Sequence, residues 1–211
     1  MIRALGKNKK QERPKNDFYC TPFSLTWAIA KEHNLQHVWE PACGQGSIVK
    51  PLIDMNIKVE SSDIDPAFDP MGLSRQFFEF TEPLADTIIS NPPFCLWDLF
   101  VFHAKFLKCN RIIYIGKTDY FSADGRSKSG IWNDLKHVKI FNRKVDYQTP
   151  YREDGLFHVG AMTSAWFVWE QGYTGKPMID IIDVQPYAKL GQFKKRENGY
   201  NTKVKQFKKE N

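Results

Sequence analysis

The residues with the clearest chemical potential lie in one short segment, Ile88–Phe94, which reads Ile-Ile-Ser-Asn-Pro-Pro-Phe. Thr87–Ile89 predicts a buried strand of a parallel sheet that stops at Asn-Pro-Pro. Proline fixes φ and lacks an N–H group, so this corner offers mainly carbonyl acceptors beside the flat ring of Phe94. If the Asn91 side-chain oxygen and the Pro92 carbonyl each accept a hydrogen from a planar amine, its lone pair can turn toward an electrophile. Asn-Pro-Pro alone also fits an ordinary strand-ending turn.

A glycine turn follows the first predicted strand. His37–Glu40 is that strand, and Pro41–Ser47 contains Gly44 and Gly46 before an expected helix. Strand, glycine turn and helix form the plan of a nucleotide-binding βαβ unit, in which glycine lets the backbone approach a ligand closely. Glu40 at the strand end would repel a pyrophosphate but suits a cationic amino-acid group. This pattern favours S-adenosylmethionine over a dinucleotide.

The second predicted strand, Lys58–Ser62, ends at two carboxylates, Asp63 and Asp65. Asp63 comes 19 residues after Gly44, at an offset where an acidic residue normally binds a ribose hydroxyl pair. We assign this role to Asp63 because it lies directly at the strand end. Both acids also fit an ordinary loop.

Two aromatic segments flank these motifs. In Asp17–Pro22, Thr21 predicts the cap and Pro22 the first position of a helix over Phe23–Glu32, and the segment also fits a lid over a ligand. Phe77–Phe80 predicts the end of a third strand, where Glu79 could accept from an adenine amine and Phe80 could flank the ring. An aromatic cluster more often belongs to a core.

The remaining elements complete an α/β pattern. We expect a helix over Leu96–Leu107 and further strands at Arg111–Ile115, Val138–Phe141, Ala165–Trp169 and Met178–Ile182. The second and third of these strands are expected to pair antiparallel. The chain of 211 residues with 42% hydrophobic residues suits one domain. We expect no transmembrane helix, no secretory signal, free cysteines in a reducing cytoplasm, and no metal.

Positive charge is concentrated at the two ends of the chain. Residues 1–16 carry a net charge of +5 and residues 187–211 carry +6, which leaves −5 for the body between them. Such basic arms suggest contacts with phosphates, although they also fit solvated tails. Residues 124–130 predict a flexible loop, and basic and aromatic residues interleave in 142–164. The body residues expected to contact nucleic acid are Phe94, Lys117, Arg126, Lys128, Arg143, Lys144 and Arg152.

Three stretches in this order, Asp17–Pro22, Glu40–Gly46 and Asn91–Phe94, resemble motifs of S-adenosylmethionine-dependent N6-adenine DNA methyltransferases. They correspond to the lid, the cofactor loop and the catalytic motif, and the short bacteriophage form is the most similar. Ala165–Glu170 resembles the last core strand of that family. Cys20 in the lid and Glu79, where the family often has Asp, depart from the pattern. Similar quartets serve RNA-adenine, guanine-N2 and protein-glutamine methyltransferases.

The resemblance implies a catalytic group formed by Asn91, Pro92, Pro93 and Phe94, in which Phe94 stacks on the target base. The residues expected to surround the cofactor are Tyr19, Thr21, Pro22, Glu40, Pro41, Ala42, Gly44, Gly46, Asp63, Ile64, Glu79, Phe80 and Asn91.

We therefore expect a doubly wound α/β domain over residues 17–186, with a mostly parallel, seven-stranded, Rossmann-like class I methyltransferase sheet. Its expected activity is methylation of the adenine N6 amine in DNA, with a flipped base and relaxed sequence specificity, as in restriction-modification systems. It would act as a monomer or homodimer in a bacterial cytoplasm. The alternatives are an RNA or protein-glutamine methyltransferase, or a non-catalytic cofactor- or DNA-binding phage protein.

Overall fold

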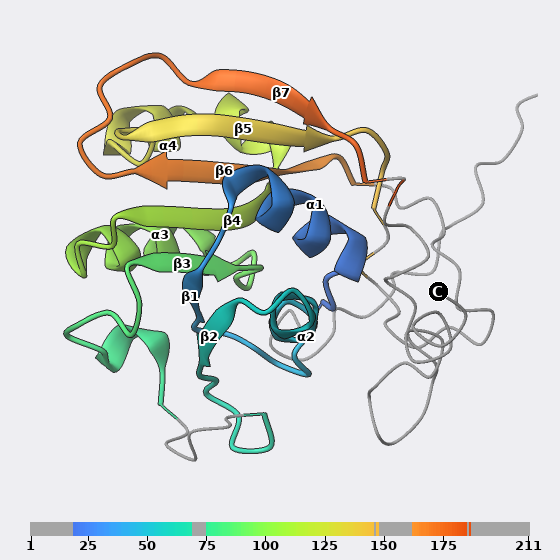
Figure 1. Ribbon diagram of the computed structural model, residues 1–211. Coiled ribbons are helices and arrows are strands. Elements are labelled where there is room, and N and C mark those ends of the chain that lie inside the picture. The colour runs from blue at the N-terminus through green and yellow to red at the C-terminus, as the bar shows by residue number, and fades with distance from the viewer. Residues whose placement is uncertain (1–18, 69–74, 146, 148–161, 185, 187–211) are drawn as a thin grey trace, which may run out of the picture.

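A computed structural model describes residues 19–68, 75–145, 147, 162–184 and 186 (Figure 1). Seven strands form one sheet in the order β2-β1-β3-β4-β6-β5-β7. The strands are β1 (His37–Glu40), β2 (Lys58–Ser61), β3 (Thr87–Ser90), β4 (Arg111–Lys117), β5 (Leu135–Phe141), β6 (Ser164–Glu170) and β7 (Met178–Ile182). Within the described ranges, no helix is long and apolar enough to cross a membrane.

The sheet is mostly parallel, as predicted. β1 runs parallel to β2 and β3, β3 to β4, and β5 to β7. β6 runs antiparallel to both β4 and β5, so the predicted antiparallel pairing of the two closing strands is confirmed. All strands except β6 therefore end at the same edge of the sheet.

Helices cover both faces, which explains the continuous apolar runs of the central strands. In β4, Ile113 and Ile115 pack in the layer with α1 (Phe23–His33) and α2 (Val49–Asp54). Ile112 and Tyr114 point to the other face, where α3 (Trp97–Phe106) contributes Trp97, Val101 and Ala104. Figure 1 shows α1 and α2 on the near side of the sheet, and α3 and α4 (Asp124–Ser129) on the far side.

The prediction of a third strand end at Phe77–Phe80 is wrong. Phe77–Glu79 forms a short 3₁₀ turn, and both Phe77 and Phe80 pack edge-to-face against Trp39, with ring centroids 5.3 and 4.8 Å away. Residues three apart share one side of a helical turn, whereas a strand would place them on opposite faces. The three-residue spacing of Phe77 and Phe80 therefore suits a helical turn, because that turn lets both rings pack against Trp39 in the core.

The prediction of a flexible loop at 124–130 is also wrong, because this segment forms α4. Within it the Lys128 ammonium donates to the Asp124 carboxylate at 2.7 Å, four residues earlier. Arg126 donates to Asp98 of α3 at 2.7 Å, and its guanidinium lies 4.0 Å from the centre of the Tyr120 ring. These contacts hold a helix that contains Gly125, and that ends at Gly130 with a positive φ of 76°, against the far face of the sheet.

Thr21 does not cap α1. The cap position is Pro22, whose carbonyl accepts from the Leu25 N–H at 3.0 Å, and no side-chain hydrogen bond caps this helix. Thr21 is instead buried at the cavity described below. Thr21 therefore contributes to the cavity lining and not to the cap of the helix.

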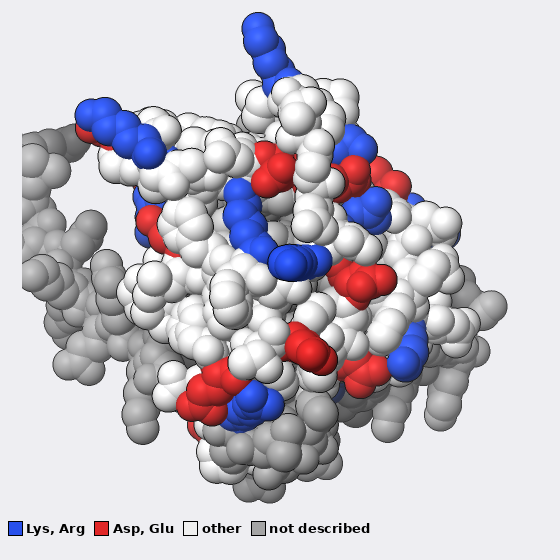
Figure 2. Space-filling model, turned by 90° about the vertical axis from the view of Figure 1, so that its left-hand side faces the viewer, with Lys and Arg blue, Asp and Glu red and all other residues white. Residues whose placement is uncertain are grey.

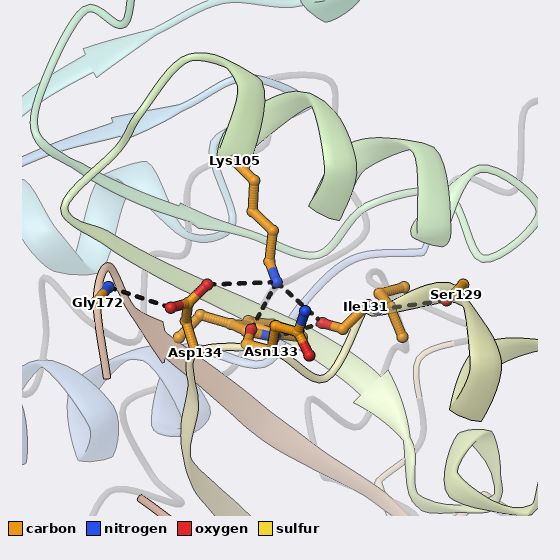
Figure 3. Close-up of polar contacts among 7 residues, drawn as sticks. Lys105, Ser129, Ile131, Asn133, Asp134 and Gly172 are labelled. Carbon is orange, nitrogen blue, oxygen red and sulfur yellow. Dashed lines mark hydrogen bonds and ion pairs between the residues drawn. The ribbon is translucent and has the colours of Figure 1, made fainter. Parts of the chain in front are cut away.

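A polar network fixes the end of α3 to the turn before β5 (Figure 3). The Lys105 ammonium donates to the Ile131 carbonyl at 3.2 Å and to the Asn133 carbonyl at 2.5 Å, and lies 3.8 Å from the Asp134 carboxylate. Asp134 also accepts from the Gly172 N–H at 3.1 Å, in the turn between β6 and β7. These bonds join three segments at the edge where β3, β4 and β5 begin.

Figure 2 views the molecule from this edge of the sheet. Acidic and basic side chains are interspersed there on a largely uncharged surface. At the start of β4 and β5, Arg111 and Lys136 form ion pairs with Glu170 at the end of β6, at 3.1 and 2.6 Å. A surface of mixed sign offers no concentrated positive field for a polyanion.

Candidate active site

A cavity of about 430 Å³ lies where β1, β2 and β3 end. Open α/β sheets bind their ligands at this edge, outside the carboxyl ends of the strands. The cavity is lined by the segment before α1, by the loops after these three strands, and by residues of the 3₁₀ turn and of α3. Its lining residues are Tyr19, Cys20, Thr21, Glu40, Pro41, Ala42, Cys43, Gly44, Gln45, Ser47, Ile48, Asp63, Ile64, Asp65, Phe68, Gln76, Phe77, Phe78, Asn91, Pro93, Leu96 and Phe100.

Asn91 presents a hydrogen-bond acceptor that has no partner within the described chain. Its Nδ2 donates to the Tyr19 carbonyl at 3.1 Å, which fixes the orientation of the carboxamide. Its Oδ1 is buried and makes no hydrogen bond. Because an unsatisfied buried acceptor costs about 1–3 kcal/mol, this oxygen is suited to a donor that arrives with a ligand.

Phe94 lies just beyond the cavity lining, in a small aromatic group. Its ring stacks on that of Tyr19 at a centroid distance of 5.7 Å and an interplanar angle of 29°. The Tyr147 ring meets it edge-on at 6.4 Å, and the Lys117 ammonium lies 5.1 Å from its centre. An aromatic surface with a cation above it therefore adjoins the Asn91 acceptor.

Asp63 shapes the glycine turn. Its Oδ2 accepts from the Gly44 N–H and its Oδ1 from the Asp65 N–H, both at 2.8 Å. Gly44 and Gly46 adopt positive φ values of 47° and 77°, which glycine tolerates and other residues rarely adopt. Asp63 thus lines the cavity with both of its oxygens already bonded to the backbone.

Glu40 is a buried carboxyl group at the cavity, with 1% of its surface exposed. Its Oε1 accepts from the Ala42 N–H at 3.1 Å and from the Ser90 hydroxyl at 2.5 Å, whereas its buried Oε2 has no hydrogen bond within the described chain. Burial raises the pKa of Glu40 to about 8, and the negative charge of Asp63 acts in the same direction. The group is therefore largely protonated at neutral pH until a cation approaches.

Glu40→Gln is expected to make the ligand-free protein relatively more stable as the pH rises. The pKa is near 4.5 in the unfolded chain and about 8 in the folded one, so the unfolded state loses its proton first. The stabilising contribution of protonated Glu40 is full below pH 4.5 and is lost as the pH approaches 8. The neutral amide avoids this loss, which amounts to a few kcal/mol.

Denaturant unfolding of both proteins at pH 5 and pH 9 measures this difference. The gap in free energy of unfolding between variant and wild type should widen in favour of the variant at pH 9. An equal gap at both pH values would show that Glu40 does not have a raised pKa.

The cavity brings together most residues predicted to bind a cofactor. Those on its lining are Tyr19, Thr21, Glu40, Pro41, Ala42, Gly44, Asp63, Ile64 and Asn91, together with Pro93 of the catalytic motif. Pro22, Gly46, Glu79, Phe80 and Pro92 lie outside the lining. Phe80 is buried against Trp39 and Glu79 is exposed, because the segment forms a 3₁₀ turn and not a strand end.

The residues predicted to contact nucleic acid are spread more widely. Lys117 adjoins Phe94, whereas Arg126 and Lys128 lie on α4 and pair with Asp98 and Asp124. Arg143 and Lys144 follow the end of β5, at the same edge of the sheet as the cavity. Arg152 and the two basic arms lie outside the described residues.

Sequence analysis missed the apolar end of the cavity. Phe77, Phe78, Leu96 and Phe100 form this end, and Phe77 stacks on Phe100 at 4.8 Å. Leu96 and Phe100 stand four residues apart, so both lie on one side of the start of α3, a spacing that is visible in the sequence. The cysteines Cys20 and Cys43 also line the cavity, and neither belongs to a disulfide within the described residues.

No protein-family model matches this sequence, and the comparison with curated proteins finds no match. The fold is similar to that of solved methyltransferase structures. One is a proposed class I S-adenosylmethionine-dependent methyltransferase from Listeria monocytogenes, with a TM-score of 0.55 and 12% identity over 85% of this chain and 70% of that one. A proposed RNA methyltransferase from Pyrococcus horikoshii gives a TM-score of 0.54 and 14% identity, over 79% of this chain and 91% of that one.

A third similar structure is the modification subunit of a proposed type I restriction enzyme from Vibrio vulnificus. It gives a TM-score of 0.50 and 13% identity over 91% of this chain, which spans 52% of that subunit. The similarity of these structures shows that this chain has the Rossmann-like class I methyltransferase fold. Within the described residues, no group of three or more His, Cys, Asp or Glu side chains could hold a metal ion.

Proposed function

We propose that the protein transfers a methyl group from S-adenosylmethionine to the N6 amine of adenine in DNA. The observation that carries this proposal is the buried, unpartnered Oδ1 of Asn91 at the rim of the cavity. A planar amine is the ligand that such an acceptor corner suits. The fold and the position of the cavity at the ends of β1, β2 and β3 support the same reading.

The residues at the cavity fit the proposed cofactor. The open Oε2 of Glu40 would accept from its cationic amino-acid end, and the Phe77 and Phe100 rings would hold its adenine. Gly44 allows close approach of the backbone, in a turn held by Asp63. When bound, S-adenosylmethionine supplies a methyl group already activated by its sulfonium.

The chain's own residues would orient the acceptor amine. Asn91 Oδ1 and the Pro92 carbonyl accept its two hydrogens and direct its lone pair toward the cavity, while Phe94 stacks on the base. The amine nitrogen would become cationic as it bonds to the methyl carbon, while the bond from that carbon to sulfur breaks and its electron pair leaves with the sulfur as a neutral thioether. The nitrogen would then release one proton to water. Positioning and hydrogen bonding to the nucleophile therefore provide the catalysis.

DNA is favoured as substrate by the basic arms and by Lys117, which lies above the Phe94 ring. The restriction-modification neighbour points the same way, whereas the Pyrococcus horikoshii neighbour keeps RNA as the second candidate. Incubation with methyl-labelled S-adenosylmethionine and parallel DNA, RNA and protein substrates separates them. We expect label in DNA, and transfer to RNA or protein alone would overturn the assignment of substrate.

The C-terminal arm is expected to supply affinity for DNA without sequence specificity. Replacing the eight Lys and Arg residues of 187–211 by Gln in the full-length chain should weaken DNA binding and leave cofactor affinity unchanged. On duplex DNA, the slope of log affinity against log salt should fall by about 0.9 for each phosphate that the arm no longer neutralises. Titrations at several salt concentrations measure this slope, and an unchanged slope would show that the arm is merely solvated.

A further inference from the structure

Ser90 connects the two halves of the site. It is the last residue of β3 and is fully buried, and it directly precedes Asn91. Its hydroxyl donates to Oε1 of Glu40, at the end of the neighbouring strand β1, at 2.5 Å. Two consecutive residues at the end of β3 thus serve different parts of the site, because Asn91 presents the acceptor for the amine and Ser90 contacts the acid for the cofactor.

The hydrogen bonds of Glu40 divide its carboxyl group into a bonded oxygen and an open one. Oε1 accepts from both Ser90 and the Ala42 N–H, which fixes the rotation of the side chain. Oε2 is left buried without a hydrogen-bond partner in the described chain. We propose that Ser90 is a positioning residue, which holds Glu40 so that this open oxygen binds the cationic group of the cofactor.

This role rests on the proposed function, since it requires a cationic cofactor. The groups that face Glu40 from the neighbouring strands do not supply a cation. Asp63, after β2, is bonded through both oxygens to backbone N–H groups, and Tyr114 of β4 is a buried phenol whose pKa is raised by burial. No ion pair to Glu40 occurs within the described part of the chain. A bound cation would therefore be the first positive charge at this carboxyl and would favour loss of its proton.

Ser90 should then set the pH dependence of cofactor binding. Its hydroxyl stabilises the Glu40 anion, so Ser90→Ala should raise the pKa of the empty site further. Because the anion loses this hydrogen bond in both the empty and the occupied site, affinity at high pH should be almost unchanged. The loss of cofactor affinity in Ser90→Ala should be confined to pH values below the midpoint of the Glu40 titration. In that range Glu40 is already partly ionised in wild type but not in the variant.

The experiment measures the dissociation constant of S-adenosylmethionine from pH 6 to 10 for wild type, Ser90→Ala and Ser62→Ala. Ser62 is a matched control because it is also a fully buried serine at the carboxyl end of a parallel strand, the edge strand β2, but its oxygen accepts from the Trp39 indole at 3.1 Å. We expect wild-type affinity to rise from pH 6 to about pH 8 as Glu40 ionises, and then to fall as the amino group of the cofactor loses its own proton. Ser90→Ala should bind roughly 10-fold or more weakly than wild type near pH 7 and match wild type at the highest pH, whereas Ser62→Ala should follow the wild-type profile and keep its midpoint.

An unchanged midpoint in Ser90→Ala, or an equal shift in both variants, would overturn this role. Carbon NMR titration of the Glu40 carboxyl in the ligand-free proteins gives a second readout that needs no cofactor, and only Ser90→Ala should shift it upward. If wild type fails to bind S-adenosylmethionine at every pH, the proposed function fails and this role fails with it. A wild type that binds, with no shift in Ser90→Ala, contradicts the role of Ser90 alone.

Discussion

Asn91→Ala is expected to lower the rate of methyl transfer by roughly 10²–10³-fold, since removal of one well-placed hydrogen-bonding group typically costs this much. The variant loses the Oδ1 acceptor that directs the amine lone pair. It also loses the bond from Nδ2 to the Tyr19 carbonyl. Cofactor affinity should change little, because Asn91 is only one of many lining residues. Single-turnover rates with saturating cofactor measure the effect on the chemical step.

Asn91→Asp provides the matched control. It keeps an acceptor oxygen of the same reach, but it replaces the donor to the Tyr19 carbonyl by a second acceptor and adds a negative charge. Its rate should therefore fall less than that of the alanine variant. Turnover near the wild-type level in Asn91→Ala would contradict the role given to the acceptor corner.

Asp63→Ala is expected to weaken cofactor binding roughly 10–100-fold, on the scale of a hydrogen bond to a charged group. Two effects combine, because the Gly44 and Asp65 N–H groups lose their acceptor and the cavity loses a carboxylate suited to the ribose hydroxyls. Calorimetric titration with S-adenosylmethionine measures the affinity. Thermal unfolding of the ligand-free variant reports separately on the backbone turn.

Asp65→Ala separates the two carboxylates. Asp65 also lines the cavity, but its Oδ1 accepts from the Ala67 N–H, at 3.0 Å in an exposed turn, and not from the glycine turn. We expect a smaller loss of affinity from this change. Unaltered affinity in Asp63→Ala together with a large loss in Asp65→Ala would move the ribose site to Asp65.

The sequence predicts those elements that are determined by residues close together in the chain. β1 and β3 are short apolar runs that end at turn residues, and both were predicted to within one residue of their bounds. The glycine turn and the acid after β2 also converge on one cavity, because parallel strands end at one edge of the sheet. The fold class followed from these patterns, and most of the residues predicted to bind a cofactor line this one cavity.

The parts that the sequence did not predict depend on contacts between distant segments. Phe77 and Phe80 form a 3₁₀ turn in which both rings pack against Trp39, a residue far away in the chain. A strand was expected there instead. α4 depends on the bond from Arg126 to Asp98 of α3. The bond between Ser90 and Glu40 joins residues 50 positions apart, so neither the spacing nor the residue types indicated it.

The identity of the methylated nucleoside tests the central claim most directly. Unmethylated DNA is incubated with the full-length protein and methyl-labelled S-adenosylmethionine, digested to nucleosides and analysed by mass spectrometry, with Asn91→Ala in parallel. We expect labelled N6-methyl-2′-deoxyadenosine from wild type and a roughly 10²-fold lower yield from the variant. Label on a ring carbon, or an equal yield from both proteins, would contradict the proposed function, because Asn91 would then not be the acceptor for the reacting amine.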